Sequence, residues 1–386
     1  MTLCAAWGDA NGDGCIPMPW LNPRRSSPPR RHPALRLPSL LTLPTGLWFE
    51  PCGGESKVLD LFVGNKGQNE LWLGDGSGSF TLVTGWPQGS GDTAAAAWGD
   101  LNGDGHLDLI ITHRGDSDGP WSTELYMNQG SSLLTTVAVG PTMDAMLTTA
   151  IAFGDVNGDG SLDLFAGNGY RGGSYGEANE LWLNDGTGVF TATSGAGPTG
   201  PRTGTTAAAF GDANGDGHLD LFVGNNLGPT GMDELWVNDG RGQFTNMPFG
   251  SQDALCAAWG DANGDGALDI YTGKLYMNDG LGSFTEATMA DPNCLVGSDD
   301  GCAEVTVLGT RGIGAWGDAN NDGFLDIFIS STWPSSTSLW LNDGASPAVR
   351  FTAAAEGGPV RESPAYQTLV IAWGDANNDG IASTSS

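Results

Sequence analysis

The sequence predicts an all-β protein of tandem repeats, a β-propeller of six to seven four-stranded blades. The phrase W/F-G-D-x-N-(G/N)-D-G occurs seven times in 386 residues, Gly is abundant at 62 residues, and no stretch shows sustained helical periodicity. The first Asp of the phrase is Asp9, Asp100, Asp155, Asp212, Asp261, Asp318 and Asp375. From Asp100 onward the spacings are 55, 57, 49, 57 and 57 residues, close to the period of a propeller blade. A solenoid of stacked hairpins is the alternative all-β architecture.

Each repeat contains four predicted strands in a fixed order. The first is an apolar run of small residues before the phrase, such as AAAAW, TAIAF or AAAF. The second, LDLFV, is apolar throughout, as expected of a strand covered on both faces. The third, ELWLN, alternates in polarity and leads through a hairpin turn, N-D-G-x-G, into a short fourth strand, x-F-T.

The first repeat is interrupted by residues 16–58. This segment holds 9 of the 21 Pro and 6 of the 15 basic residues, so its composition differs from that of the other repeats. It is either a basic, proline-rich arm or a translated intron, and we expect no ordered structure in it. Residues 1–15 then supply the first strand and the start of the first acidic loop, 59–371 hold blades one to six, and 372–386 begin a truncated seventh repeat.

A nine-residue acidic loop, D-x-N-x-D-G-x-x-D, follows the first predicted strand. Side-chain oxygens at positions 1, 3, 5 and 9 and the backbone carbonyl at position 7 can surround one cation, and an all-oxygen set favours Ca²⁺ over Zn²⁺ or Cu²⁺. The candidate ligands are Asp9, Asn11, Asp13 and Asp60 once 16–58 is set aside; Asp100, Asn102, Asp104, His106 through its backbone, and Asp108; Asp155, Asn157, Asp159 and Asp163; Asp212, Asn214, Asp216 and Asp220; Asp261, Asn263, Asp265 and Asp269; Asp318, Asn320, Asp322 and Asp326; and Asp375, Asn377 and Asp379. We therefore expect several structural calcium ions.

The alternative for this loop is that its Asp and Asn residues form Asx turns without any metal. A metal-free loop would hold three carboxylates close together with no compensating cation. Because this arrangement recurs in five uninterrupted copies, the sequence favours calcium.

The unit W/F-G-D-x-N-G-D-G-x-L-D-L-F-V-G-N resembles the FG-GAP repeat of the integrin α-subunit propeller, and more closely the FG-GAP-like, VCBS-type repeats of secreted and surface proteins. The likeness covers nearly all of the chain except 16–58. V-G-N stands where integrins have G-A-P, which argues against membership of the integrins themselves. The resemblance implies a seven-bladed propeller with calcium in the loops between strands 1 and 2.

The connections between strands 2 and 3 vary in length and are expected on the face opposite the acidic loops. Variable loops on a rigid scaffold are common recognition sites. The candidate ligand-binding residues there are Trp121, Tyr170, Arg171, Tyr175 and Trp333. Packing between neighbouring blades is the alternative role for these aromatic side chains.

The charge balance limits the partners. With 15 Lys and Arg against 45 Asp and Glu, the net charge of −30 repels phosphate backbones and anionic lipid, so we expect no nucleic-acid partner. No apolar run of about 18 residues is present, so we expect no membrane insertion. The repeat begins directly after Met1, and we expect a truncated N-terminus and an extracellular or cell-surface location.

Together these features predict a non-catalytic, calcium-binding extracellular module for binding or adhesion, with a protein or carbohydrate ligand on the variable-loop face. A propeller domain of a secreted polysaccharide lyase or hydrolase, or a lectin, is the alternative. Catalysis would require clustered basic and phenolic side chains, and only Arg171 with Tyr170 and Tyr175 suggests such a cluster. A scaffold fragment of a larger surface protein is a third possibility.

Overall fold

The computed structural model describes twenty-four strands and many of the loops between them. The described residues are 2–8, 60–74, 80–84, 91–114, 122–128, 134–137, 148–169, 178–193, 197–198, 204–225, 231–252, 254–287, 312–317, 320, 322–332, 335–344 and 351–353. The predicted all-β class is confirmed for this part of the chain, within which no helix has the length and apolar character needed to cross a membrane.

The strands form six sets of four. They are β1 (Thr2–Gly8), β2 (Asp60–Gly67), β3 (Glu70–Gly74) and β4 (Phe80–Leu82); β5 (Gly91–Gly99), β6 (Asp108–Arg114), β7 (Ser122–Asn128) and β8 (Leu134–Val137); β9 (Thr148–Gly154), β10 (Asp163–Asn168), β11 (Glu180–Asn184) and β12 (Phe190–Ala192); β13 (Thr205–Gly211), β14 (Asp220–Asn225), β15 (Met232–Asn238) and β16 (Phe244–Gln252); β17 (Ala258–Gly260), β18 (Asp269–Tyr271), β19 (Leu275–Asn278) and β20 (Phe284–Glu286); and β21 (Gly312–Gly317), β22 (Asp326–Thr332), β23 (Ser335–Asn342) and β24 (Phe351–Ala353). We call these sets the first to the sixth sheet.

Within every sheet the four strands pair antiparallel in chain order, as the repeat predicted. The register is the same throughout: the Gly that ends the first strand faces the Asp that begins the second, as Gly99 faces Asp108 and Gly211 faces Asp220. In the first sheet Gly8 faces Asp60, so β1 and β2 pair in this register although 51 residues separate them in the sequence. A short pairing of Lys66 with Asp92 also joins the first sheet to the second.

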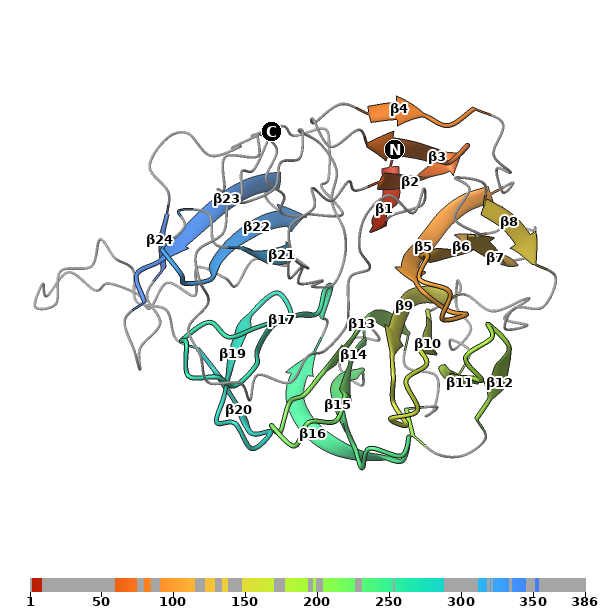
Figure 1. The fold of residues 1–386 in the computed structure, drawn as a ribbon. Helices are drawn as coiled ribbons and strands as arrows, with labels where there is room; N and C mark the ends of the chain where they lie inside the picture. Colours follow the sequence, from red (N-terminus) through yellow and green to blue (C-terminus); the bar gives the residue numbers. More distant parts are fainter. Residues whose placement is uncertain are drawn as a thin grey trace, which may run out of the picture.

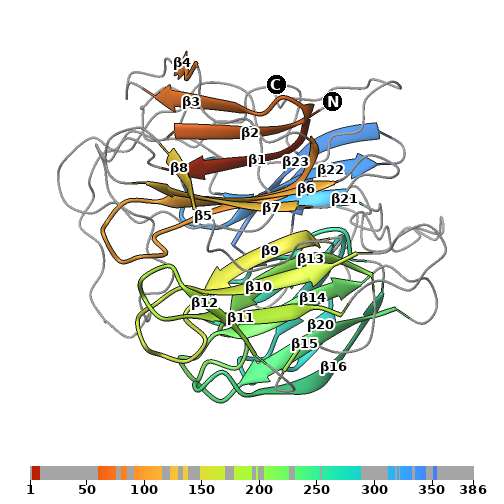
Figure 2. The ribbon, with the colours of Figure 1, turned by 90° about the vertical axis from the view of Figure 1, so that its right-hand side faces the viewer.

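The six sheets are arranged around a common centre, with the first strand of each nearest to it (Figure 1). These inner strands touch in sequence, β1 with β5, β5 with β9, β9 with β13, β13 with β17 and β17 with β21. Among the described residues no contact of that extent joins β21 to β1. Seen from the side, the strands of successive sheets lie in layers, so the loops gather at the two ends of the strands (Figure 2).

The W/F-G pair of the repeat connects neighbouring sheets. A Cβ atom on Gly211 would lie 2.7 Å from the ring of Trp259 in the following sheet, and one on Gly154 would lie 2.9 Å from the ring of Phe210. The indole N–H of Trp259 also donates to the carbonyl of Ala209, at 3.3 Å. Glycine is therefore required because the next aromatic ring packs directly over the backbone.

The apolar core lies between successive sheets. One cluster combines Phe165 and Leu181 of the third sheet with Phe210 and Leu221 of the fourth, and small residues such as Ala208 fill the inner strands. Phe165 and Leu221 are fully buried. Burial on both faces explains why the second strands are apolar along their whole length.

Candidate functional site

The acidic loops between the first and second strands are built by a repeated set of hydrogen bonds. In the loop 212–220, the Asp212 carboxylate accepts from the backbone N–H of Asp216 at 3.0 Å and of Gly217 at 2.9 Å. Asn214 Oδ1 accepts from Asp216 N at 2.9 Å. Asp216 Oδ1 accepts from His218 N at 2.9 Å. These are Asx turns, and Gly217 allows the chain to reverse with a φ of 88°.

The same bonds recur at the same positions in the loops 100–108, 155–163 and 261–269. The corresponding acceptors are Asp100, Asn102 and Asp104; Asp155, Asn157 and Asp159; and Asp261, Asn263 and Asp265. In the loop that ends at Asp326, Asn320 and Asp322 accept from Asp322 N and Phe324 N, each at 2.9 Å. Five acidic loops therefore share one local structure as far as they are described.

The Asp at position 9 is the buried member of each loop. Asp220 is fully buried, and its two oxygens accept from Ala213 N at position 2 of the loop and from Asn238 N at the end of the third strand, at 3.0 and 2.8 Å. Asp108, Asp163 and Asp269 make the equivalent pair of bonds. Position 9 thus joins the acidic loop to the third strand of its own sheet.

Burial raises the pKa of these carboxyl groups. The pKa is raised to about 7 at Asp108 and Asp220 and to about 6 at Asp163 and Asp269, mainly because the charged form is desolvated. The two backbone hydrogen bonds oppose this shift, and the negative charges at positions 5 and 1 of the same loop add to it. The three carboxylates of a loop are therefore close enough to repel one another.

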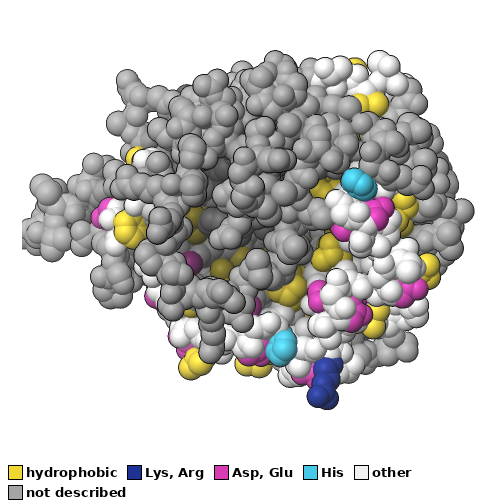
Figure 3. All heavy atoms as spheres, in the orientation of Figure 1, with side chains coloured by type: hydrophobic (Ala, Val, Ile, Leu, Met, Phe, Trp, Pro, Cys, Tyr) yellow, Lys and Arg dark blue, Asp and Glu magenta, His cyan; other side chains and the backbone are white. Residues whose placement is uncertain are grey.

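Basic side chains do not offset this repulsion in the loops 100–108, 155–163, 212–220 and 261–269. The ion pairs His113–Glu124 and Lys274–Glu286 do not involve the carboxylates of these four loops. Figure 3 shows acidic side chains in separate groups around the face of the molecule that Figure 1 presents. Over the same ranges, no group of three or more His, Cys, Asp or Glu side chains stands in a geometry that could hold a metal ion.

By donor chemistry the loops nevertheless fit Ca²⁺. Each offers carboxylate oxygens at positions 1, 5 and 9 and an amide oxygen at position 3, and a carboxylate oxygen that accepts a hydrogen bond retains a lone pair for a metal. Binding would require these side chains to move toward a common centre. Of the predicted ligands, Asp60 begins β2. Asp9, Asn11, Asp13, Asp318, Asp375, Asn377 and Asp379 lie outside the described residues.

The five predicted ligand-binding residues, Trp121, Tyr170, Arg171, Tyr175 and Trp333, also lie outside the described residues, as do the segment 16–58 and residues 372–386. Their predicted roles therefore remain predictions.

An asparagine at the end of the third strand is a structural residue that the sequence analysis missed. Asn238 Nδ2 donates to Leu219 O of its own loop and to Val156 O of the preceding loop, at 3.0 and 2.8 Å. Its Oδ1 accepts from Gly240 N and Gly242 N, each at 3.2 Å. The N-D-G-x-G motif predicted only a hairpin turn, although the recurrence of Asn directly before D-G at Asn184, Asn238, Asn278 and Asn342 was a usable signal.

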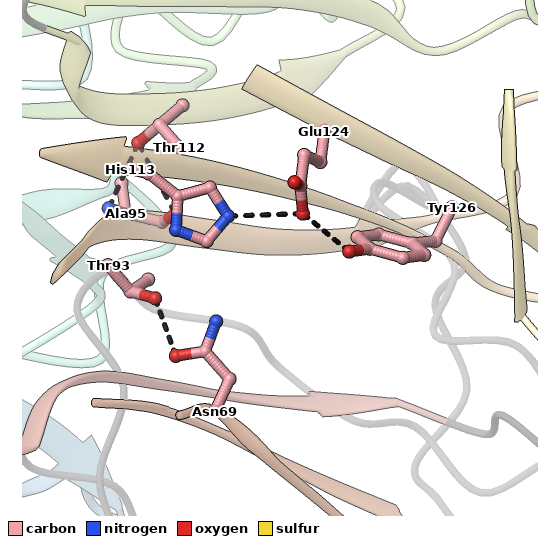
Figure 4. Close-up of polar contacts among 7 residues, drawn as sticks. All are labelled: Asn69, Thr93, Ala95, Thr112, His113, Glu124 and Tyr126. Atoms are coloured by element: carbon pink, nitrogen blue, oxygen red, sulfur yellow. Dashed lines mark hydrogen bonds and ion pairs between the residues drawn. The ribbon is translucent and has the colours of Figure 1, made fainter. Parts of the chain in front are cut away.

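The opposite ends of the strands carry a second set of buried polar contacts. In the fourth sheet Thr205 Oγ1 donates to Asn179 of the third sheet at 2.9 Å and to Asn225 at 3.2 Å. In the second sheet His113 occupies the position equivalent to Asn225, and its Nε2 lies 3.2 Å from Glu124 Oε2 (Figure 4). Tyr126 OH donates to the same Glu124 oxygen. This hydrogen-bonded His–Glu–Tyr group is confined to the second sheet among the described sheets.

The electrostatics of that group follow from its contacts. The hydrogen bond from His113 lowers the pKa of Glu124, whereas burial raises the pKa of Tyr126. His113 itself is only 2% exposed, and its Nδ1 has no hydrogen-bond partner among the described residues. Thr93 and Asn69 bond to each other beneath the imidazole ring (Figure 4), so the group lies where the first and second sheets meet.

Sheets of four antiparallel strands, joined in series by W/F-G contacts and carrying D-x-N-x-D-G loops, define a class of tandem-repeat β-proteins. The chain matches the FG-GAP-like repeat model over residues 57–111, 155–223, 217–272 and 318–382, together more than half of its length. It therefore belongs to the FG-GAP-like repeat family.

The chain matches none of the curated proteins. Among solved structures it is similar to the crystal structure of the V. cholerae biofilm matrix protein Bap1, with 15% sequence identity and a TM-score of 0.38. That match covers 65% of this chain and 38% of Bap1, so the chain spans well under half of that protein.

Proposed function

We propose that the protein is a calcium-binding β-propeller in which the metal is structural and the module serves binding or adhesion outside the cell. The observation that carries this proposal is the position-9 aspartate. It is fully buried in five loops. At Asp108, Asp163, Asp220 and Asp269 it lies near two further carboxylates and has no basic partner among the described residues. Buried charges in proteins are normally paired or bound to a metal.

Calcium would supply the positive charge that these loops lack. The side chains at positions 1, 3, 5 and 9 and the carbonyl at position 7 would hold it. In the loop 212–220 these are Asp212, Asn214, Asp216 and Asp220, with the carbonyl of His218. Because the ion binds only the folded loop, it would raise the free energy of unfolding.

The competing proposal is that the loops work as metal-free Asx turns. It is favoured by the backbone hydrogen bonds that already occupy each loop and by the absence, among the described residues, of a group in metal-holding geometry. The two proposals differ in a measurable quantity, the stability gained from added calcium.

The test is the melting temperature of the whole chain in excess calcium and in excess chelator. We expect a clear rise with calcium and no rise with magnesium at equal ionic strength. A matched variant, Asp216→Ala, removes one exposed candidate ligand and should reduce the calcium-dependent rise. Equal melting temperatures in calcium and chelator would reject calcium binding and leave the Asx-turn proposal.

Ring closure and the ligand are further parts of the proposal. The serial contact of inner strands from β1 to β21 supports a propeller, and small-angle scattering would distinguish a closed ring from an open arc. Extracellular modules often bind calcium with dissociation constants of about 10⁻⁴ to 10⁻³ M. We propose this range for these solvent-exposed loops, together with an extracellular or cell-surface location.

We propose that a protein or carbohydrate ligand binds at the end of the strands opposite the acidic loops. There the connections differ from sheet to sheet, whereas the acidic loops do not. A glycan array would test for carbohydrate binding, and product release from a polysaccharide would instead establish the lyase or hydrolase alternative.

A further inference from the structure

We propose that neighbouring acidic loops bind calcium cooperatively, and that the asparagine ending the third strand couples them. This proposal rests on the calcium binding proposed above. It adds a positioning residue and limits the coupling to the loops of successive sheets. The residues concerned are Asn184, Asn238, Asn278 and Asn342.

A continuous chain of hydrogen bonds joins the position-9 carboxylate of one loop to that of the preceding loop. Asp220 Oδ1 accepts from Asn238 N at 2.8 Å, and Asn238 Nδ2 donates to Val156 O at 2.8 Å. Val156 N in turn donates to Asp163 Oδ2 at 3.0 Å. Asn238 and Val156 are 82 residues apart, so this connection exists only because the two sheets are adjacent.

The same connection recurs between every described pair of successive loops from the second sheet to the sixth. Asn184 donates to Leu101 O at 2.8 Å, Asn278 to Ala213 O at 2.7 Å and Asn342 to Ala262 O at 2.7 Å. In each case the acceptor is position 2 of the preceding loop. Each asparagine also donates to position 8 of its own loop, so both hydrogens of its amide group are used.

A second observation, independent of the amide group, places the loops against their neighbours. A Cβ atom on Gly215, at position 4 of its loop, would lie 3.4 Å from the carbonyl oxygen of Gly280 in the hairpin of the next sheet. Gly158 has the same relation to Gly240, at 3.7 Å. The hairpin after the third strand therefore rests directly on the preceding acidic loop.

These contacts determine the sign of the coupling between calcium sites in neighbouring loops. Calcium in one loop would fix its position-9 carboxylate and, through the asparagine, the peptide at position 2 of the preceding loop. The neighbouring loop would then lose less conformational freedom when it binds its own ion, which produces positive cooperativity. Because each link joins only successive sheets, the coupling should be limited to nearest neighbours.

The glycine at position 6 provides a reporter in each loop. Its N–H donates to the position-1 carboxylate at 3.0 Å in Gly105 and at 2.9 Å in Gly160, Gly217 and Gly266. Calcium titrations of the whole chain labelled with ¹⁵N-glycine, followed by NMR, would give a separate affinity for each loop.

The first variant is Asp216→Ala, which disables the loop 212–220 through an exposed side chain. We expect the affinity of the adjacent loops 155–163 and 261–269 to fall about fivefold, within the usual range of coupling between sites. The affinity of the loop 100–108, two sheets away, should stay unchanged. Unaltered affinity in both adjacent loops, 155–163 and 261–269, would overturn the cooperativity while leaving calcium binding intact.

The second variant, Asn238→Ala, should remove the coupling between the loops 155–163 and 212–220 but keep that between 212–220 and 261–269, which depends on Asn278. The matched control is Asn246→Ala, an exposed asparagine in β16 of the same sheet. If Asn238→Ala does not fold, Asp216→Ala still decides the question. If the glycine signals do not respond to calcium at all, calcium binding itself fails.

Discussion

The two ends of the sheets satisfy buried polar groups in different ways. At the acidic-loop end, position 9 and the third-strand asparagine make the same bonds in sheet after sheet, as Asp163 with Asn184 and Asp220 with Asn238 do. At the opposite end the third sheet uses Asn168 with Thr148, whereas the second uses His113 with Glu124.

This difference indicates where the chain can vary. At the acidic-loop end the same hydrogen bonds recur from sheet to sheet, which suggests a requirement common to the sheets. Cation binding is such a requirement. At the opposite end different residue pairs make the buried contacts, which indicates that the sheets can be joined there by any matched hydrogen-bond donors and acceptors.

Asp220→Ala should destabilise the protein far more than a change at the equivalent opposite end. It leaves the N–H groups of Ala213 and Asn238 without acceptors in a buried site, which costs about 3 kcal/mol in total. Asn225→Ala should cost about 1 kcal/mol, because Thr205 keeps its bond to Asn179. The bond lost from Asn225 Nδ2 is to the carbonyl of the exposed residue Met232. Urea unfolding in chelator measures both, and equal losses would contradict the contrast between the ends.

The pH dependence of stability should reverse its sign with calcium. Without metal, the position-9 carboxyl groups have pKa values of about 6 to 7, above the unfolded value of about 3.9, so the folded state binds more protons between about pH 4 and 7. Stability then falls as the pH rises through this interval. In saturating calcium the ligands must be ionised, so stability should rise with pH instead.

Melting temperatures measured across that interval, with calcium and with chelator, check this prediction. If the melting temperature changes with pH in the same way in calcium and in chelator, the carboxylates do not bind the ion.

His113→Asn should have a smaller effect, because it gives the second sheet the residue that the third and fourth sheets use at the same position. The loss of the contact with half-buried Glu124 should cost about 1 kcal/mol. The midpoint of urea unfolding is the measurement. A loss as large as that of Asp220→Ala would show that the histidine is not interchangeable with asparagine.

Lys274→Ala should have the smallest effect, below about 0.5 kcal/mol. The Lys274 and Glu286 side chains are 46% and 40% exposed, so water screens their 2.9 Å ion pair. The difference in melting temperature between this variant and the unmodified chain should be nearly the same at low and at high salt.

Most of the strand order could be predicted from the sequence, because each strand carries a local signal. LDLF gives β10 and β14, ELW gives β11, and the Asp at position 9 begins every second strand as the motif suggested. The contacts between sheets could not be predicted in the same way. The partner of Asn184 Nδ2 lies 83 residues earlier, at Leu101, and nothing local to Asn184 indicates it.

The acidic loops illustrate the same limit. Their residues and spacing were evident, but the choice between Asx turns and a metal site depends on side-chain positions that differ by small movements. The W/F-G pair likewise suggested only a strand end. Its glycine is required because an aromatic ring of the next repeat, such as Trp259 over Gly211, occupies the space of a side chain.

That glycine–aromatic contact also bears on how the chain unfolds. From the third sheet to the sixth, the described contacts place an aromatic ring of each sheet on the glycine of the sheet before it, so stability should be a sum of sheet and nearest-neighbour contributions. The third, fourth and fifth sheets have such contacts on both sides, through Gly99, Gly154, Gly211 and Gly260, and should exchange their backbone amide hydrogens last. Unfolding would then proceed from one sheet to the next. One damaged repeat would lower the stability of the adjacent sheets before that of more distant ones.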